Sequence, residues 1–382
     1  MSQARKGPKG KMRLRLAVLA VAAAGLLTTA PSAAAVPADF WGVSPQQTPS
    51  LEQFQRLRAG GVDSVRIPIP WSGVEAVKGA PDFSHVDNLV AGAAGAGLDI
   101  LPFVYDAPSW AVSRVPVPGS GGRVRAVKTL PVKSGAQRSA WSSFLGLVVA
   151  RYGPGGAFWA ANPAIPPRPI RTWQIWNEQN FKYFVVRPNP ADYGKLINIS
   201  YAAVKGVDPG AKLILGGMFS QPREAQFKAK PPQAYFASDF LDRLYSSTPG
   251  VKRKFVGVAL HPYTIKYQEL TPDIEAFRQV LVENQDAGKK LWITEIGWSS
   301  LPRAGNDGFS QGPNGQVKQL EGAFRTFKAK QVKWKLKRIY WFSVDDAPGS
   351  CNFCGGTGLF GEGFLPKKSW FAYVKFAGGN PG

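Results

Sequence analysis

The stretches Trp173-Gln-Ile-Trp-Asn-Glu178 and Leu291-Trp-Ile-Thr-Glu295-Ile-Gly-Trp298 decide the fold class and point to a site. Each is a short run of β-branched and aromatic residues that leads to a single glutamate. A carboxylate at the end of a buried strand costs several kcal/mol to desolvate unless it is paired, so an ordinary core does not keep one. If both strands belong to one parallel barrel, both carboxylates emerge at its C-terminal rim, where barrel enzymes place their chemistry.

Short β-rich runs alternate along the chain with segments of helical periodicity. The predicted strands cover residues 40–43, 64–69, 99–104, 172–176, 213–216, 256–260, 291–296 and 338–342. The predicted helices cover residues 51–59, 86–96, 141–152, 193–207, 234–245, 274–285 and 316–329. Eight parallel strands joined by such crossovers close into a (β/α)8 TIM barrel, which is an α/β fold. An open doubly wound sheet is the competing topology, but no Gly-x-Gly-x-x-Gly directly follows a predicted strand.

Residues 1–35 are predicted to be a secretory signal peptide, and residues 36–382 a single barrel domain. Six basic residues precede the apolar stretch 16–30, and three alanines at 33–35 follow it, as in a cleaved signal. The stretch is too short to span a bilayer comfortably, and no later segment has about 18 uncharged apolar residues, so no stable membrane span is predicted. An uncleaved anchor is the alternative. The basic residues are Arg5, Lys6, Lys9, Lys11, Arg13 and Arg15.

The chain has only two cysteines and two histidines. In an oxidising compartment, Cys351 and Cys354 can close a local disulfide, and two reduced thiols are the alternative. A structural zinc site usually needs four Cys or His ligands, so no metal is predicted. No cofactor is predicted either.

Two motifs resemble those of the retaining β-glycosidases of glycoside hydrolase clan A, most nearly its family 39 and family 5-like barrels. The stretch Ile175-Trp-Asn177-Glu178-Gln-Asn180 looks like the Asn-Glu motif of the clan's fourth strand, and Ile293-Thr-Glu295-Ile-Gly-Trp298 is similar to its seventh-strand motif. The resemblance implies that Glu178 is the general acid/base and Glu295 the nucleophile. Two departures affect subsite specificity: Gln179 replaces a common proline, and the frequent strand-three histidine is absent.

Four further residues fall where such a site would need them. Arg66 lies within an apolar strand and needs a buried anionic partner, for which Glu295 is the candidate. Asn177 resembles the residue that hydrogen-bonds the sugar 2-hydroxyl in this clan. Tyr263, two residues after His261, looks like the tyrosine that hydrogen-bonds the nucleophile. His261 itself is either a substrate contact or a structural residue.

Aromatic side chains at the same rim are predicted to stack on the apolar faces of sugar rings. Trp341, in Ile339-Tyr-Trp341-Phe, looks like the family's sugar platform on the eighth strand. Tyr105 and Trp110 resemble a strand-three element of family 39. Aromatic packing beneath the loops is the alternative for each of the three.

The chain is strongly basic, with a formal net charge of +22, or +16 without residues 1–35. Basic residues lie on or beside a long loop, 106–140, which follows a strand and is therefore predicted to lie over the active face. They can attract an anionic glycan, while a solvated loop is the plainer interpretation. No nucleic-acid-binding motif accompanies the charge. The residues are Arg123, Arg125, Lys128, Lys133 and Arg138.

The sequence therefore predicts a secreted or cell-wall-associated, metal-independent O-glycosyl hydrolase. It is expected to cleave a polysaccharide or oligosaccharide by double displacement, without nucleic acid as a partner. Three alternatives stay open: a non-catalytic carbohydrate-binding barrel, a transglycosylase at the cell wall, and a charge-driven wall scaffold.

Overall fold

The computed structural model describes residues 36–116, 124–220, 233–302, 308–349 and 354–382, together with Gly7 and Pro231. The predicted signal peptide, residues 1–35, lies outside the described residues apart from Gly7. Cys351 also lies outside them, whereas Cys354 is described and does not carry a free thiol. In the described part of the chain, none of the helices is long and apolar enough to cross a membrane.

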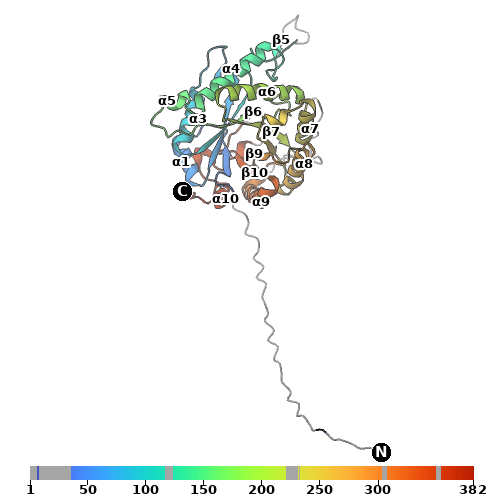
Figure 1. Ribbon diagram of the computed structural model, residues 1–382. Helices are drawn as coiled ribbons and strands as arrows, with labels where there is room; N and C mark the ends of the chain where they lie inside the picture. Colours follow the sequence, from blue (N-terminus) through green and yellow to red (C-terminus); the bar gives the residue numbers. More distant parts are fainter. Residues whose placement is uncertain are drawn as a thin grey trace, which may run out of the picture. The chain divides into compact units, whose positions relative to one another are not determined.

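Eight parallel strands close into a barrel that is surrounded by helices (Figure 1). Around the barrel the order is β1, β2, β3, β6, β7, β8, β9 and β10, and β10 pairs with β1. The architecture is the (β/α)8 TIM barrel that the alternation of strands and helices predicts. The strands are β1 Trp41–Ser44, β2 Ser64–Pro70, β3 Asp99–Tyr105, β6 Thr172–Ile175, β7 Lys212–Ser220, β8 Gly257–Pro262, β9 Lys290–Ile296 and β10 Leu336–Phe342.

Each predicted helix is present; the one over residues 51–59 has the predicted bounds, and the others have shifted ends. The helix predicted from residue 141 begins at residue 135, because Ser134 and Gln137 form a capping box in which each side chain accepts from the other's backbone N–H. The helices are α1 Leu51–Ala59, α2 Trp71–Val74, α3 Ser84–Gly95, α4 Gly135–Tyr152, α5 Ala157–Ala161, α6 Pro190–Val207, α7 Ala237–Ser247, α8 Leu270–Glu283, α9 Gly312–Trp334 and α10 Lys368–Ala377. Short 3-10 turns are η1 Val251–Arg253, η2 Tyr267–Glu269, η3 Cys354–Gly356 and η4 Glu362–Phe364.

The long loop after β3 is not wholly irregular. It contains an antiparallel pair of short strands, β4 Arg114–Pro116 and β5 Val124–Ala126. The hairpin is tied to the loop after β6, because Val186 N donates to Lys128 O over 2.8 Å. Two loops at the C-terminal ends of neighbouring strands are thereby joined.

The barrel interior is apolar at one level and polar at the next. The apolar level is formed by Leu101, Ile214, Ala259, Trp292 and Tyr340. Because side chains two residues apart in a strand face the same side, the inward position after Trp292 is Thr294. Arg66 and Gln174 reach the same level from β2 and β6, and both are fully buried.

A β-bulge in β9 changes the direction of its last side chains. Ile293 pairs with Ile339 and Ile296 with Trp341, so three steps along β9 lie opposite two steps along β10. The extra residue interrupts the alternation. As a result, the consecutive residues Thr294 and Glu295 both contact side chains of the barrel interior.

Candidate active site

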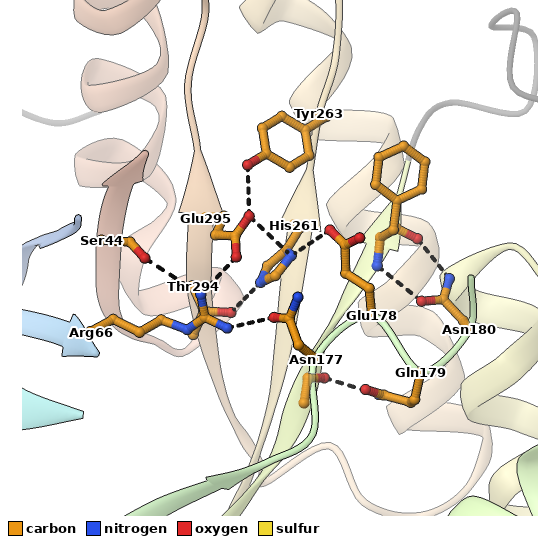
Figure 2. A network of polar contacts seen from close by, with 12 residues as sticks. Ser44, Arg66, Asn177, Glu178, Gln179, Asn180, His261, Tyr263, Thr294 and Glu295 are labelled. Carbon is orange, nitrogen blue, oxygen red and sulfur yellow. Dashed lines mark hydrogen bonds and ion pairs between the residues drawn. The ribbon is translucent and has the colours of Figure 1, made fainter. Parts of the chain in front are cut away.

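Two buried glutamates face each other at the C-terminal ends of the strands (Figure 2). Glu178 follows β6, and Glu295 is the penultimate residue of β9. One oxygen of each carboxyl group and one ring nitrogen of His261 all lie within 4.8 Å of one another. The structure therefore brings together the two carboxylates that the strand motifs single out.

The backbone after β6 turns sharply to place Glu178. Trp176 and Glu178 have positive φ angles of 72° and 42°, which side chains other than glycine adopt at a cost of about 1–3 kcal/mol each. The turn is held because Glu178 N donates to Gly217 O on β7 over 2.9 Å. The neighbouring Gln179 is buried, and its Nε2 donates to Gly216 O over 3.1 Å, which stabilises the turn.

Glu295 is bound on both of its oxygens. Arg66 Nη1 donates to Oε1 over 2.7 Å, and Tyr263 OH donates to Oε2 over 2.8 Å. Both contacts were expected from the sequence. Arg66 Nη2 also donates to Asn177 Oδ1 over 2.6 Å, which orients the amide beside Glu178. The guanidinium lies 3.8 Å from the centre of the Phe103 ring, a cation–π contact in the barrel interior.

His261 lies beneath the two carboxylates with no exposed surface. Its Nδ1 lies 2.9 Å from Glu178 Oε1 and 3.6 Å from Glu295 Oε2, and its Nε2 lies 2.8 Å from Thr294 Oγ1. The ring fits there because residue 217 is glycine: a Cβ at that position would lie 1.9 Å from Nε2. Of the two interpretations of His261, the structure therefore supports the buried residue and not the substrate contact.

The surroundings of the site shift the pKa values of its side chains in different directions. Burial raises the pKa of Glu178 well above its usual range, and the charge of Glu295 raises it further, against the opposing effect of Arg66. Burial, with Arg66 nearby, holds the pKa of His261 well below its usual range. Burial and the two glutamates raise the pKa of Tyr263, so it stays a hydrogen-bond donor. The site thus combines a carboxyl group whose ionisation is disfavoured with a second carboxyl group that is paired with Arg66, an arrangement that can support acid–base chemistry.

The same three side chains are the one group of the described residues that could hold a metal ion. Their contacts fit acid–base chemistry better. Both Glu295 oxygens already accept hydrogen bonds from Arg66 and Tyr263, and the positive charge of Arg66 would oppose a cation at this place.

Trp341 does not reach the site, which corrects the expectation of a sugar platform there. It is fully buried, its Nε1 donates to Thr357 O over 3.0 Å, and its ring packs against Phe324 of α9. Alternation along β10 explains the error, because Tyr340 faces the barrel interior and the next residue must face the helices. Phe342 returns to the inner side and packs edge-on against Tyr263, with 6.3 Å between ring centres.

Tyr105 and Trp110 lie on or after β3 and are partly buried. The Tyr105 ring packs 4.8 Å from Phe103, and burial with the charge of Asp106 raises its pKa to about 12. Trp110 Nε1 donates to Glu75 O over 3.1 Å, and its ring packs edge-on against Trp71, with 5.2 Å between ring centres. Within the described residues, neither ring makes a hydrogen bond to the two carboxylates.

Sequence reasoning missed two polar residues of the site, Gln174 and Thr294. Gln174 accepts from Arg66 Nε over 2.7 Å and donates to Thr294 Oγ1 over 3.3 Å. A signal was available, since Gln174 is a polar residue inside an apolar strand that ends at Glu178. Thr294 and Glu295 are consecutive and would face opposite sides of a regular strand, so the sequence did not show that both face the interior; the bulge in β9 allows it.

No family model matches this chain, and no curated protein matches it. Solved structures do. A family 39 glycoside hydrolase from Bacteroides cellulosilyticus is 19% identical with a TM-score of 0.61, over 90% of this chain and 64% of that one. A family 39 β-xylosidase from Caulobacter crescentus is 20% identical with a TM-score of 0.57, over 89% of this chain and 72% of that one. A family 5 enzyme from Bifidobacterium longum, in complex with Manβ1-4GlcNAc, is 13% identical with a TM-score of 0.60, over 89% of this chain and 78% of that one.

These likenesses identify the class of the fold. The chain has the TIM-barrel fold of clan A glycoside hydrolases, as the resemblance of its two glutamate motifs implies. It spans about two thirds of the length of the first of these structures.

Proposed function

We propose that this protein is a retaining β-glycoside hydrolase that cleaves a polysaccharide or oligosaccharide, with Glu178 as general acid/base and Glu295 as nucleophile. The observation that carries the proposal is the pair of buried carboxyl groups with oxygens within 4.8 Å of each other. A retaining mechanism places the two groups about 5–5.5 Å apart, whereas an inverting one leaves about 6.5–9.5 Å for a water molecule.

In the first step, a Glu295 oxygen attacks the anomeric carbon while Glu178 gives its proton to the departing glycosidic oxygen. The C–O bond to the leaving group breaks, and a glycosyl ester to Glu295 forms. The ester removes the charge that helps to keep Glu178 protonated, and Glu178 is itself now ionised. In the second step, Glu178 takes a proton from water, the oxygen of that water attacks the anomeric carbon, and the ester breaks.

Arg66 and Tyr263 are proposed to orient the nucleophile, since each donates to a different oxygen of Glu295. Asn177, held by Arg66, is proposed to bind the sugar hydroxyl next to the reacting carbon. Transfer to a second sugar uses the same ester with a sugar hydroxyl in place of water, so a transglycosylase at the cell wall is the alternative activity. A non-catalytic binding barrel is the alternative without chemistry.

Product analysis over time tests the proposal on a panel of β-glucans, galactans, xylans and arabinose-containing glycans. Wild type is compared with Glu295→Gln and Glu178→Gln, and with Glu283→Gln as a matched control on the exposed face of α8. We expect products from wild type and the control, with the β configuration in the first-formed product. Equal activity of Glu295→Gln would overturn the nucleophile assignment, and sugar binding without products in every protein would favour the binding barrel.

We further propose that the substrate is anionic, because the loops after β3 and β6 carry exposed cations that form no ion pair with a described residue. Of the residues singled out by sequence, Arg123 lies outside the described residues, Lys133 pairs with Asp192 over 2.5 Å, and Arg138 donates to Val132 O over 3.0 Å. The remaining cations, which we call the basic lip, form no ion pair with a described residue. The basic lip consists of Arg114, Arg125, Lys128, Lys182 and Arg187.

Lys182 and Arg187 of the basic lip follow β6, the strand that leads to Glu178, so the lip is proposed to contact the leaving-group side of the glycan. The exposed Tyr183 ring lies beside it and packs 4.9 Å from Phe181, three residues after Glu178. We expect turnover of a uronate-containing glycan to fall as salt rises from about 50 to 500 mM, because exposed charges are screened within about 10 Å at 0.1 M. Equal salt dependence for a neutral glycan would count against the basic lip as a substrate contact.

The protein is also proposed to act outside the cell, in solution or at the wall, because of the predicted signal peptide. The N-terminal residue of the exported protein tests this proposal: a start near Val36 is expected, and an intact residue 1 would support the uncleaved anchor.

A further inference from the structure

A chain of buried side chains joins Arg66 to Glu178 by way of His261. Arg66 Nε lies 2.7 Å from Gln174 Oε1, and Gln174 Nε2 lies 3.3 Å from Thr294 Oγ1. Thr294 Oγ1 lies 2.8 Å from His261 Nε2, and His261 Nδ1 lies 2.9 Å from Glu178 Oε1. Gln174, Thr294 and His261 have no exposed surface, so water does not compete for these bonds.

The donors and acceptors of this chain can be assigned one after another. A guanidinium only donates, so Gln174 must present its oxygen to Arg66 and its amide N–H groups to Leu215 O and Thr294 Oγ1. Thr294 Oγ1 therefore accepts from Gln174. Its own hydrogen has one acceptor among the contacts of that oxygen, which is His261 Nε2.

We infer that Gln174 and Thr294 are positioning residues that fix His261 as the tautomer with its proton on Nδ1, and that this N–H points at Glu178 Oε1. The other tautomer would put a hydrogen on Nε2 opposite Thr294 and leave the threonine hydrogen without an acceptor. A buried donor without a partner disfavours that tautomer by a factor on the order of 10 to 100.

The tautomer of His261 determines which oxygen of Glu178 carries the acid proton. Because Oε1 of Glu178 accepts from His261, the proton that Glu178 delivers must be on Oε2. After delivery, the same N–H group stabilises the new carboxylate, and Glu295 Oε2 lies 3.6 Å from it. The charged and titratable groups around the ring are Glu178, Glu295, Arg66 and Tyr263. Arg66 thus contacts the proposed nucleophile directly and the proposed acid through three side chains.

Nitrogen-15 spectra of the histidine rings test the tautomer without any substrate. The chain has only His85 and His261, and His85 is exposed on α3, so His85→Gln assigns the signals. We expect His261 to show a protonated Nδ1 and an unprotonated Nε2 in the wild-type protein between about pH 5 and 8. An Nε2–H tautomer or an imidazolium in that range would overturn the inference.

Three variants test whether Gln174 and Thr294 set the tautomer of His261. Thr294→Val removes the hydroxyl at nearly constant shape and is expected to give a mixture of tautomers, while Thr294→Ser restores Nδ1–H. Gln174→Glu keeps an acceptor for Arg66 but can no longer donate to Thr294, so the threonine hydrogen can turn away and His261 is expected to shift toward Nε2–H. An unchanged Nδ1–H signal in both Thr294→Val and Gln174→Glu would show that neither residue controls the ring.

The effect on turnover rests on the proposed function and is measured separately. Aryl β-glycosides with a poor phenol leaving group need the acid, and we expect Thr294→Val to lose on the order of 10-fold in kcat on them. In dinitrophenyl glycosides the dinitrophenolate departs without needing a proton, so the rate of glycosyl transfer from these substrates should change less than about 3-fold. Equal losses on both substrates would assign Thr294 a general structural role. If no glycoside is cleaved, the proposed function fails while the spectra still decide the tautomer.

Discussion

The charge of Glu295 is expected to help hold the proton on Glu178, and Glu295→Gln tests this coupling. The two carboxyl groups have oxygens within 4.8 Å of each other. At that separation and an effective dielectric constant of about 20, two unit charges repel by about 3.5 kcal/mol. The substitution removes the repulsion and keeps the shape, so the free energy of ionising Glu178 is expected to fall by up to about 3.5 kcal/mol. Burial remains, so the pKa of Glu178 stays above its ordinary value.

Carbon-13 spectra of the glutamate carboxyl groups, recorded across pH, measure this change. The signal of Glu178 is assigned from its absence in Glu178→Gln, and Glu283→Gln is the control, because Glu283 is exposed on the outer face of α8. We expect the Glu178 titration to move to lower pH in Glu295→Gln and to stay in place in the control. An unmoved titration in Glu295→Gln would refute the coupling and leave burial as the whole cause of the raised pKa.

Three further perturbations have expected outcomes. Burial raises the pKa of Asp273 from 3.8 to about 6, so its contribution to the free energy of unfolding is complete below about pH 4 and is lost as the pH rises through 6. Asp273→Asn should therefore raise the free energy of unfolding at pH 8 by up to about 3 kcal/mol, and equal free energies for wild type and variant in urea titrations would contradict this. Trp341→Ala should lower the free energy of unfolding by about 3–5 kcal/mol with little change in KM, whereas Phe342→Ala should raise KM; the reverse pattern would restore Trp341 as a sugar platform. Gly217→Ala should place a Cβ 1.9 Å from His261 Nε2 and reduce kcat at least 10-fold while circular dichroism stays native, and full activity would mean that the ring can move.

Much of the architecture could be predicted from local sequence. Strand and helix periodicity identified all eight barrel strands, because each is a short β-branched or aromatic run between helical segments. The position of Arg66 within an apolar strand also required a buried anion, and the structure supplies it in Glu295. Element ends were less predictable: the start of α4 depends on a side-chain cap at Ser134, and the β4–β5 hairpin carries little apolar signal.

The assignment of Trp341 failed because side chains alternate between the two faces of a strand, and Thr294 was missed because its place depends on contacts between strands. Trp341 was assigned to the rim from its motif, yet one residue along β10 decides between the barrel interior and the helix layer, and Phe342 takes the inner side. Thr294 and Glu295 share the interior only because β9 is bulged, a feature of the pairing with β10.

The sequence by itself determined the barrel, the two glutamates and the arginine, because strand periodicity and the cost of burying a charge are local properties. Only the tertiary structure decided that His261 lies beneath both glutamates and that Gln174 and Thr294 connect it to Arg66. Those contacts join β2, β6, β8 and β9, strands that lie far apart in the chain. Barrel closure and the bulge in β9 bring them within hydrogen-bond distance, and neither can be inferred from one strand alone.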